Sequence, residues 1–240
     1  MVLLKEYRIC LPMTLAELHK AEMFTFINMA VKESKNGEGV RISVDKHFQD
    51  EEVMGIARSG RFTRKEYKIK SKIPFWARPF LPKKFKFVHE DEWNAHPYSK
   101  KEIYVPGLKD DYLVKVTSIC VKDDRGKEQN VFNLDIDDLR KRQISVLDIG
   151  KENKSMKTNR GQLYKNWIDG YKPIVCIYML VNVQCKYLEK KIEEKFRELT
   201  LKFYKNVFIS IDLWCTLTFK QVEAIVKESK AELEDRIKSE

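Results

Sequence analysis

Residues 72–88, with the sequence KIPFWARPFLPKKFKFV, combine large apolar side chains with positive charges. Three prolines disfavour a regular helix or a central strand, so this segment is predicted to be a surface loop. Its largest apolar side chains are Phe75, Trp76, Phe80 and Leu81. Exposed rings flanked by lysine and arginine suit contact with a membrane whose head groups are anionic. The alternative is that the same side chains fold back into a small satellite core.

The residues that most often perform catalysis or bind metals form no recognisable constellation in this sequence. No two cysteines have C-x-x-C spacing, and no histidine is close to a cysteine in sequence. The sequence also lacks a G-x-S-x-G elbow, a P-loop and an H-E-x-x-H motif. The four histidines are His19, His47, His89 and His96. We therefore expect a binding protein rather than an enzyme, with no metal site and no cofactor.

The charge of the chain favours an anionic partner. The 240 residues carry a formal net charge of +10, which suits either nucleic acid or an acidic membrane surface. The cations are spread along the chain, and no zinc-finger or glycine-rich RNA-binding pattern is visible, so a membrane is favoured over nucleic acid. The longest apolar run, residues 173–183, is too short to span a bilayer. We expect a monomer that visits membranes from the cytoplasm.

The number and the sequence contexts of the five cysteines also favour the cytoplasm. Their number is odd, and most of them lie in apolar, strand-like contexts. This usage is typical of buried free thiols in a reducing compartment.

Apolar alternation predicts a protein rich in strands. The expected strands cover residues 2–11, 40–44, 62–70, 102–105, 112–121 and 174–186. Residues 122–160 are polar and are expected to form a long loop region with one or two short elements. The length suits a single domain, 1–240, of the α+β class.

Helices are expected near both ends of the chain. Thr14 and Glu17 form a capping-box pattern for a helix that ends near residue 32, and Thr218 with Gln221 marks the start of a final helix. Apolar residues at helical spacing cover 188–203, whereas 208–214 is expected to be a further strand. The apolar stripe of the final helix suits either a packed core or a lid over a cavity.

Several short motifs occur in a specific order and at specific separations. They are MVLLKEYRICLP at the start, Thr63-Arg64-Lys65, Trp93-Asn94-Ala95-His96-Pro97-Tyr98, Lys154-Ser155-Met156-Lys157-Thr158-Asn159-Arg160-Gly161 and Asn166-Trp167. In this order, the chain resembles the phosphatidylinositol transfer proteins from Met1 to about Arg236. The resemblance implies a START-like helix-grip fold, in which a curved antiparallel sheet and a long C-terminal helix enclose one phospholipid in a cavity.

The resemblance also assigns roles to individual residues. It implies an inositol site at Thr63, Lys65 and Asn94, and a phosphate site that includes Lys101 and Ser118. It places Glu22, Met179 and Val226 where the family uses other residue types, which leaves the preferred head group open. The wholly apolar face of the 174–186 strand is expected to contact the acyl chains. That face also includes Cys185, and the residues expected to make the contact are Val175, Ile177, Met179, Val181 and Val183.

The resemblance further implies two membrane contacts and one modification. The 72–88 loop corresponds to the family's lipid-exchange loop, and a membrane-docking motif of the family falls at Tyr187 and Leu188. Ser155 matches a kinase site of relatives, although a plain loop serine is the alternative. The expected function is the exchange of one phosphatidylinositol or phosphatidylcholine molecule between membranes. The alternatives are a carrier of another phospholipid and a basic membrane-surface adaptor with a vestigial cavity.

Overall fold

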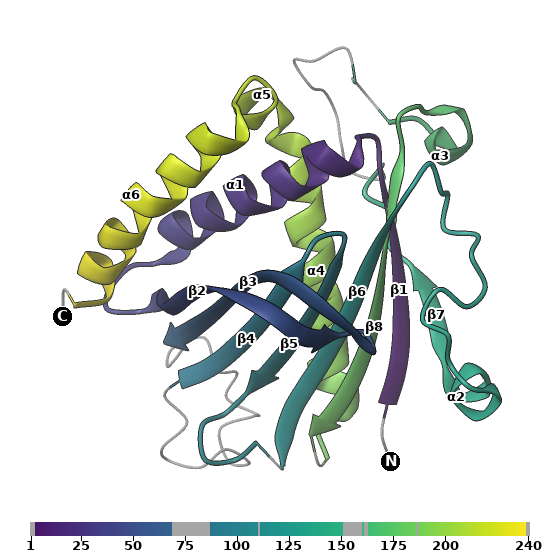
Figure 1. Ribbon diagram of the computed structural model, residues 1–240, viewed down its shortest axis with the longest axis horizontal. Coiled ribbons are helices and arrows are strands. Elements are labelled where there is room, and N and C mark those ends of the chain that lie inside the picture. The colour runs from purple at the N-terminus through teal and green to yellow at the C-terminus, as the bar shows by residue number, and fades with distance from the viewer. Residues whose placement is uncertain are drawn as a thin grey trace.

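A computed structural model describes residues 3–68, 87–109, 111–150, 160, 163–185 and 187–238 (Figure 1). In this part of the chain, eight strands form one sheet in the order β2-β3-β4-β5-β6-β8-β1-β7. The strands are β1 (Leu3–Leu11), β2 (Gly39–Val53), β3 (Ile56–Lys68), β4 (Phe87–Ala95), β5 (Tyr98–Tyr104), β6 (Tyr112–Lys122), β7 (Gln143–Val146) and β8 (Val175–Cys185). The helices are α1 (Leu15–Glu33), α2 (Ile136–Lys141), α3 (Trp167–Gly170), α4 (Glu189–Ile209), α5 (Ile211–Trp214) and α6 (Phe219–Lys238).

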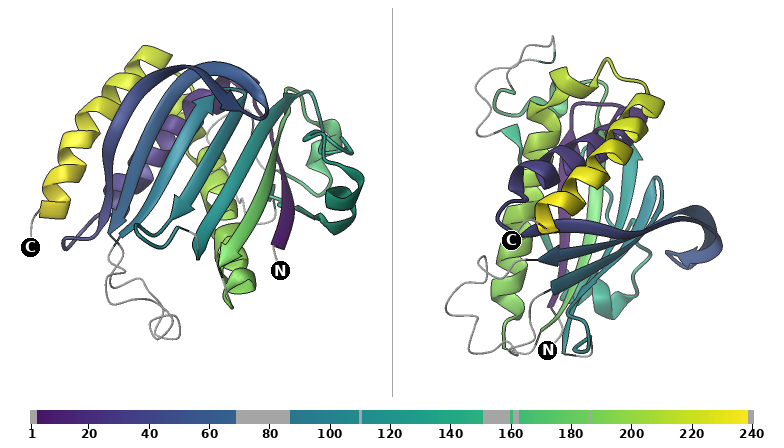
Figure 2. Two further views of the ribbon diagram at one scale, coloured as in Figure 1. Left: turned by 60° about the horizontal axis from the view of Figure 1, so that its bottom comes forward. Right: turned by 90° about the vertical axis from the view of Figure 1, so that its left-hand side faces the viewer.

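The three long helices lie on one face of the curved sheet. Figure 2 shows α1, α4 and α6 together on this side, while the sheet bends around them. Helix α6 packs against α1 and β2, and α4 packs against α1, β1 and β8. Two register shifts in β2, between Ile42 and Val44 and between Phe48 and Glu51, accompany this bend. The α+β class and the curved sheet predicted from the sequence are therefore confirmed.

One strand pairing departs from the predicted antiparallel sheet. Strand β7 is parallel to β1, whereas the other neighbouring strands run antiparallel. After β6, the polar segment that contains α2 returns the chain to the start of β1, so β7 must run in the same direction as β1. The fully buried Glu6 accepts hydrogen bonds from Arg8 at 2.7 Å and from Arg142 at 2.6 Å, which fixes the residue directly before β7.

Both predicted helix starts are confirmed by their capping hydrogen bonds. The Glu17 carboxylate accepts from the Thr14 backbone N–H at 2.8 Å, and the Thr14 hydroxyl accepts from the Glu17 N–H at 3.2 Å. Thr218 and Gln221 exchange the equivalent bonds at 2.8 Å and 3.3 Å at the start of α6. Each pair satisfies backbone groups that a helix start leaves without partners.

The predicted strand at residues 208–214 is wrong, because this segment is helical. It contains the end of α4 and all of α5. Val207, Ile211 and Trp214 are fully buried, and their spacing of four and three residues follows a helix. The Trp214 indole N–H also donates to the Val207 carbonyl at 3.1 Å. A short apolar run is compatible with both the helical period of 3.6 residues and the strand period of two, so its packing partners decide between them.

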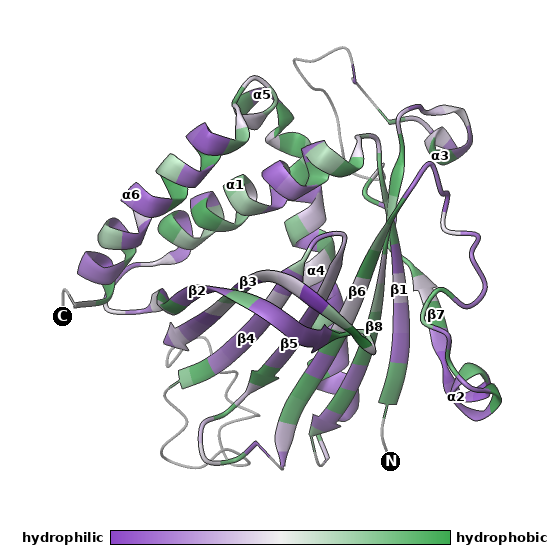
Figure 3. Ribbon diagram, in the orientation of Figure 1, coloured by the Kyte–Doolittle hydropathy of each residue, from purple (hydrophilic) through white to green (hydrophobic). Residues whose placement is uncertain are grey.

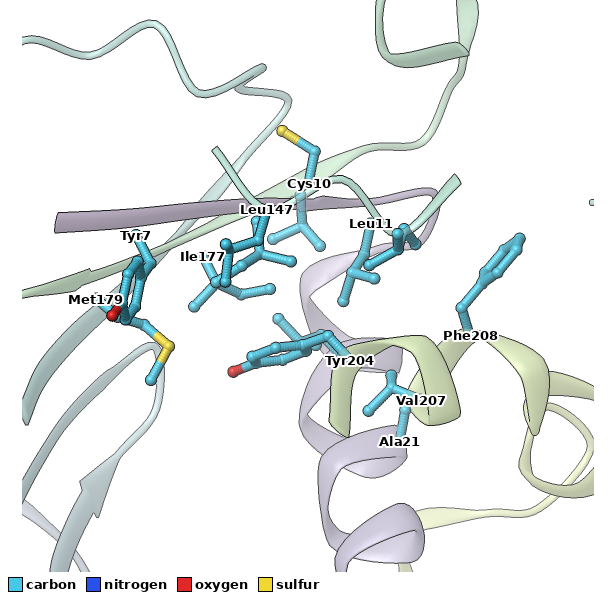
Figure 4. Packing of buried hydrophobic residues seen from close by; sticks show 14 of the residues in the cluster. Tyr7, Cys10, Leu11, Ala21, Leu147, Ile177, Met179, Tyr204, Val207 and Phe208 are labelled. Carbon is cyan, nitrogen blue, oxygen red and sulfur yellow. The ribbon is translucent and has the colours of Figure 1, made fainter. Parts of the chain in front are cut away.

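The main hydrophobic core lies between the sheet and these helices. Figure 4 shows Tyr7, Ile177 and Met179 of the strands on the same side as Tyr204 and Val207 of α4. Helix α6 alternates hydrophobic and hydrophilic residues along its length (Figure 3). Its apolar stripe turns inward, since Val222, Val226 and Leu233 are buried. The sheet face that carries this core is called the inner face below.

Candidate functional site

The inner face of the sheet changes from polar to apolar between β5 and β6. Residues directly opposite one another on neighbouring strands share a face. One row runs Thr63–Glu92–Lys101–Val116–Val181 across β3, β4, β5, β6 and β8. A neighbouring row runs Lys65–Glu90–Ile103–Val114–Val183. We call the inner-face residues of β3 to β5 the polar half, and those of β6, β8 and β1 the apolar half.

Four charged residues form the centre of the polar half. The Lys65 ammonium group lies 2.7 Å from a Glu90 carboxylate oxygen and 2.6 Å from one of Glu92. The Lys101 ammonium lies 3.1 Å from Glu92 and 3.8 Å from Glu90. We call these four residues the charge quartet. Two lysines and two glutamates make its formal charge zero.

Burial and ion pairing shift the pKa values of the quartet in opposite directions. Burial alone would lower the pKa of Lys65, but Glu90 and Glu92 raise it above its ordinary value. Burial alone would raise the pKa of Glu92, but Lys101 and Lys65 hold it well below its ordinary range. All four groups are therefore charged at neutral pH, and each depends on its partners for that charge.

Helix α1 adds a further carboxylate to the same region. Glu22 accepts a hydrogen bond from the Tyr204 hydroxyl of α4 at 2.9 Å. Burial raises the pKa of Glu22 to about 7, although Tyr204 and Lys101 oppose that rise. Glu22 is half-buried. Among the residues that the structure describes, Glu22 lies near the quartet and has no basic side chain at hydrogen-bonding distance.

The apolar half contains the residues that were predicted to contact acyl chains. All five are buried and lie on the inner face of β8; they are Val175, Ile177, Met179, Val181 and Val183. Val114 and Val116 of β6 extend this surface toward the polar half, and both are buried. The burial and the shared face agree with the prediction, while contact with a lipid stays a prediction.

The five predicted head-group residues lie on neighbouring strands of one face. Lys65 and Lys101 belong to the charge quartet, and Thr63 is opposite Glu92. Asn94 lies at the end of β4, where its side-chain oxygen accepts the His96 backbone N–H at 3.1 Å. The structure therefore brings the predicted positions together, and it gives Asn94 a local task in the β4–β5 turn. Their assignment to a head group stays a prediction.

Ser118 occupies the boundary between the two halves. It is opposite Ser99 of the polar half and Met179 of the apolar half. Its side chain is only 7% exposed. Within the described ranges, no other residue is a hydrogen-bond partner of its hydroxyl group. The hydroxyl group is therefore available to a ligand.

Helix α6 is fastened over the polar half by ionic contacts. Asp45 of β2 accepts two hydrogen bonds from Arg61, at 2.6 Å and 2.7 Å, and contacts Lys230 of α6. Burial alone would raise the pKa of Asp45, but Arg61 and Lys230 lower it to about 2. Arg236 donates to the carbonyl oxygens of Val31 at 2.9 Å and Ser34 at 3.2 Å. Val226, where the family uses another residue type, is a buried residue of α6 itself.

Only part of the predicted membrane contacts lies among the described residues. Phe75, Trp76, Phe80 and Leu81 lie outside the described residues, as does Ser155. Tyr187 is 79% exposed directly after β8, whereas Leu188 is 6% exposed and belongs to the core. Of this pair, Tyr187 alone presents its side chain at the surface in the described structure.

Membrane-spanning helices and metal clusters are two other features that could form a functional site. No helix among them is long and apolar enough to cross a membrane. Over the same ranges, no three histidine, cysteine, aspartate or glutamate side chains are grouped as metal ligands. Neither result adds a second candidate site.

Sequence reasoning missed Glu90, Glu92 and Tyr204 as members of the site. A signal for the glutamates was present, because Glu90 and Glu92 alternate in a strand directly before the Trp93-Asn94 motif. Their partners Lys65 and Lys101 are 25 and 9 residues away in sequence from Glu90 and Glu92, respectively, so only sheet register pairs them. Tyr204 gave no comparable signal, since a tyrosine in an amphipathic helix is ordinarily core.

A curved sheet covered on one face by a long C-terminal helix defines the helix-grip class of fold. Comparison with known sequences gives the family within that class. The sequence profile described as phosphatidylinositol transfer protein matches residues 2–231. A relative from Drosophila melanogaster, "Cytoplasmic phosphatidylinositol transfer protein 1", is 30% identical over 99% of this chain and 92% of its own length.

Further relatives agree with this assignment. "Phosphatidylinositol transfer protein 5" of Dictyostelium discoideum is 29% identical over 97% of this chain and 86% of its own length. "Phosphatidylinositol transfer protein beta isoform" of Homo sapiens is 27% identical over 98% of this chain and 94% of its own length. The chain belongs to the phosphatidylinositol transfer protein family. That membership confirms the predicted family and supports a carrier rather than an enzyme.

Proposed function

We propose that this protein carries one phospholipid molecule between membranes, with phosphatidylinositol or phosphatidylcholine as cargo. The observation that carries the proposal is the division of the inner face. The apolar half offers β8 side chains such as Val181 to the acyl chains, and the polar half offers hydrogen-bonding groups to the head group. Since each buried CH₂ group is worth about 0.8 kcal/mol, a lipid leaves a membrane slowly unless a carrier replaces that apolar environment. The phospholipid is cargo that is not chemically changed, so its transfer needs no cofactor.

Docking on an anionic membrane belongs to the same proposal. Trp76 and Phe80 of the 72–88 segment are expected to enter the lipid interface, assisted by neighbouring cations. Tyr187 is the exposed candidate on the described surface. The protein is expected to act as a monomer in the cytoplasm and to bind membranes transiently, without nucleic acid.

Blocking the apolar half is the direct test of the carrier function. Val181→Trp places a large ring among fully buried side chains, so the expected result is a protein that stays folded but loads no phospholipid. Lipid content is measured by native mass spectrometry after incubation with vesicles. Gln184→Trp is the matched control, because Gln184 lies on the opposite face of β8. Unchanged lipid content in Val181→Trp, with folding verified by circular dichroism, would contradict an acyl-chain site at this face.

The docking segment has its own test. Trp76→Ala combined with Phe80→Ala is expected to reduce co-sedimentation with anionic vesicles and to slow lipid transfer, while lipid already in the protein remains bound. Raising the salt concentration should weaken sedimentation further, because it screens the cationic contribution. If the double variant behaves like the wild type, Tyr187→Ala is expected to give the defect. A basic adaptor that binds vesicles but holds no lipid is the second function that these assays would reveal.

A further inference from the structure

The charge quartet leaves no spare cation for an anionic head group at Lys65. Its ammonium group contacts carboxylates of both Glu90 and Glu92. It also lies 4.5 Å from the centroid of the Phe26 ring, which covers its remaining side. Lys65 is only 7% exposed. Its donors are therefore already committed within the protein, and its charge is balanced there.

Donors for a phosphate are present at the boundary of the two halves. The side chain of Lys101 is 27% exposed, and its nearest carboxylate is a single Glu92 oxygen at 3.1 Å. An ammonium group has three N–H donors, so Lys101 retains donors for a ligand. Ser118 offers its hydroxyl group at the next diagonal position of the same face. Together they can bind one phosphate group of a phospholipid.

An acceptor for a cation is present beside these donors. Glu22 has the Tyr204 hydroxyl as its hydrogen-bond donor and no basic side chain at ion-pair distance in the described ranges. The charged or titratable groups that act on it come from every element around it: Lys65 of β3, Glu92 of β4, Lys101 of β5, Cys120 of β6 and Tyr204 of α4. A ligand ammonium would give this carboxylate the counter-charge that the protein does not provide.

We propose that the polar half selects phosphatidylethanolamine, with the lipid phosphate at Lys101 and Ser118 and the primary ammonium at Glu22. This inference rests on the proposed carrier function and names a further head-group class for the same site. The ethanolamine bridge is short, so its phosphate and ammonium remain close together, and Glu22 is close enough to Lys101 for their charges to interact. The lipid has no net charge, which matches a quartet whose formal charge is zero.

Other common head groups fit this arrangement less well. An inositol head group adds a neutral polyol to the phosphate, so it brings an anion near Glu22 without a compensating cation. A serine head group adds a carboxylate near Glu22, Glu90 and Glu92, while the donors that Lys101 retains are taken by the lipid phosphate. A choline head group has no N–H to donate to Glu22, and Lys65 already occupies the Phe26 ring as its cation.

A competition experiment tests the inference on the full chain. The protein is incubated with phosphatidylcholine vesicles that contain equal fractions of ethanolamine, serine and inositol phospholipids with identical acyl chains. It is then separated from the vesicles, and its lipids are quantified by mass spectrometry. The expected result is an ethanolamine-to-inositol ratio in the protein about tenfold or more above the ratio in the vesicles, as one charge-assisted hydrogen bond can give.

Two variants locate the selectivity. Glu22→Gln is expected to lower the ethanolamine enrichment about tenfold while total phospholipid content is retained. Ser118→Ala is expected to weaken all phospholipids alike, because each has a phosphate. Glu33→Gln is the matched control, since Glu33 is an exposed carboxylate on the same helix that pairs with Lys202 at the surface. Because burial raises the pKa of Glu22 to about 7, enrichment should be larger at pH 8 than at pH 6 in the wild type and independent of pH in Glu22→Gln.

The outcomes separate this inference from the proposed function. Loading of phosphatidylinositol or phosphatidylcholine without enrichment of the ethanolamine lipid would overturn the inference and leave the carrier function intact. Equal enrichment of serine and ethanolamine lipids, or an unchanged preference in Glu22→Gln, would also overturn it. A protein that takes up no phospholipid from any vesicle would overturn both.

Discussion

The two halves of the inner face are built from strands of one sheet, yet they use opposite means of stabilisation. In the apolar half, Val181 and Ile177 are removed from water among other apolar side chains, and the stabilisation depends on volume and area. In the polar half, Lys65 is equally removed from water, but its stability depends on Glu90 and Glu92. The apolar half tolerates any apolar group that fits. The polar half is selective, because each buried charge must find a specific partner.

The largest expected difference comes from removing one member of the charge quartet. Lys65→Met removes the nearer of the two cations that contact Glu90 and Glu92 and leaves both buried carboxylates to Lys101 alone, so the free energy of unfolding should fall by about 3–5 kcal/mol. Urea denaturation at pH 7 measures this change. Lys115→Met, on the exposed face of β6, is the matched control and is expected to stay within about 0.5 kcal/mol of the wild type. Recovery of stability on adding Glu92→Gln to Lys65→Met would assign the loss to pairing rather than packing.

The next largest effect is expected from Glu22→Gln, which should raise the free energy of unfolding by an amount that depends on pH. The pKa of Glu22 is raised from 4.5 to about 7, so the folded state holds its proton more tightly than the unfolded state does. The resulting penalty is absent below pH 4.5 and complete above pH 7. Glu22→Gln should therefore raise the free energy of unfolding by about 3 kcal/mol at pH 8 and by less than about 1 kcal/mol at pH 5. Equal effects at the two pH values would contradict a buried carboxyl group that titrates near neutrality.

A smaller effect is expected where α6 is fastened to the polar half. Asp45 has a pKa lowered from 3.8 to about 2, so its contribution is present above pH 3.8 and is lost as the pH falls through 2. After allowance for the partly exposed Arg61, Asp45→Asn should lower the free energy of unfolding by about 1–2 kcal/mol at pH 7 and by about half as much at pH 3. Hydrogen exchange should show faster opening of α6 in this variant. Unchanged exchange would mean that Asp45 does not hold the helix.

The smallest change in the free energy of unfolding is expected when one buried side chain of the apolar half is shortened. Ile177→Val removes one methylene group from a fully buried position, which should lower the free energy of unfolding by about 0.5–1.5 kcal/mol. Unlike the two carboxylate variants, this change should be the same at pH 5 and pH 8, because no titrating group is involved. A pH-dependent loss would show that the two halves are energetically coupled.

Particular elements show why part of the fold was readable from sequence and part was not. The capping pairs Thr14–Glu17 and Thr218–Gln221 act within four residues, so the sequence alone predicted both helix starts. The 208–214 segment was wrongly predicted as a strand, because a short apolar run is compatible with both periods until its packing is known. Strand β7 was hidden in a polar segment, since its position depends on Arg142 reaching the buried Glu6 across 136 residues of sequence.

The candidate site divides in the same way. Alternating residues of β8 made its apolar face visible, because the side-chain period of a strand is a local property. The family motifs predicted Thr63, Lys65 and Asn94 as head-group positions, and the structure places them on one face of the sheet. The partners of Lys65 were not visible, because a glutamate in a strand gives no sign of whether it meets water or a buried lysine.

The sequence by itself determined the family, the class of fold, the helix starts and the apolar face of β8, since all of these depend on local periodicity or on ordered motifs. Only the tertiary structure decided how the charges of the interior are shared. Sheet register places Glu92 opposite Lys101 and diagonal to Lys65, and helix packing brings Glu22 to Tyr204. Those contacts join segments that are far apart in the chain, and the free energy of a buried charge depends on which partner lies within a few ångströms of it.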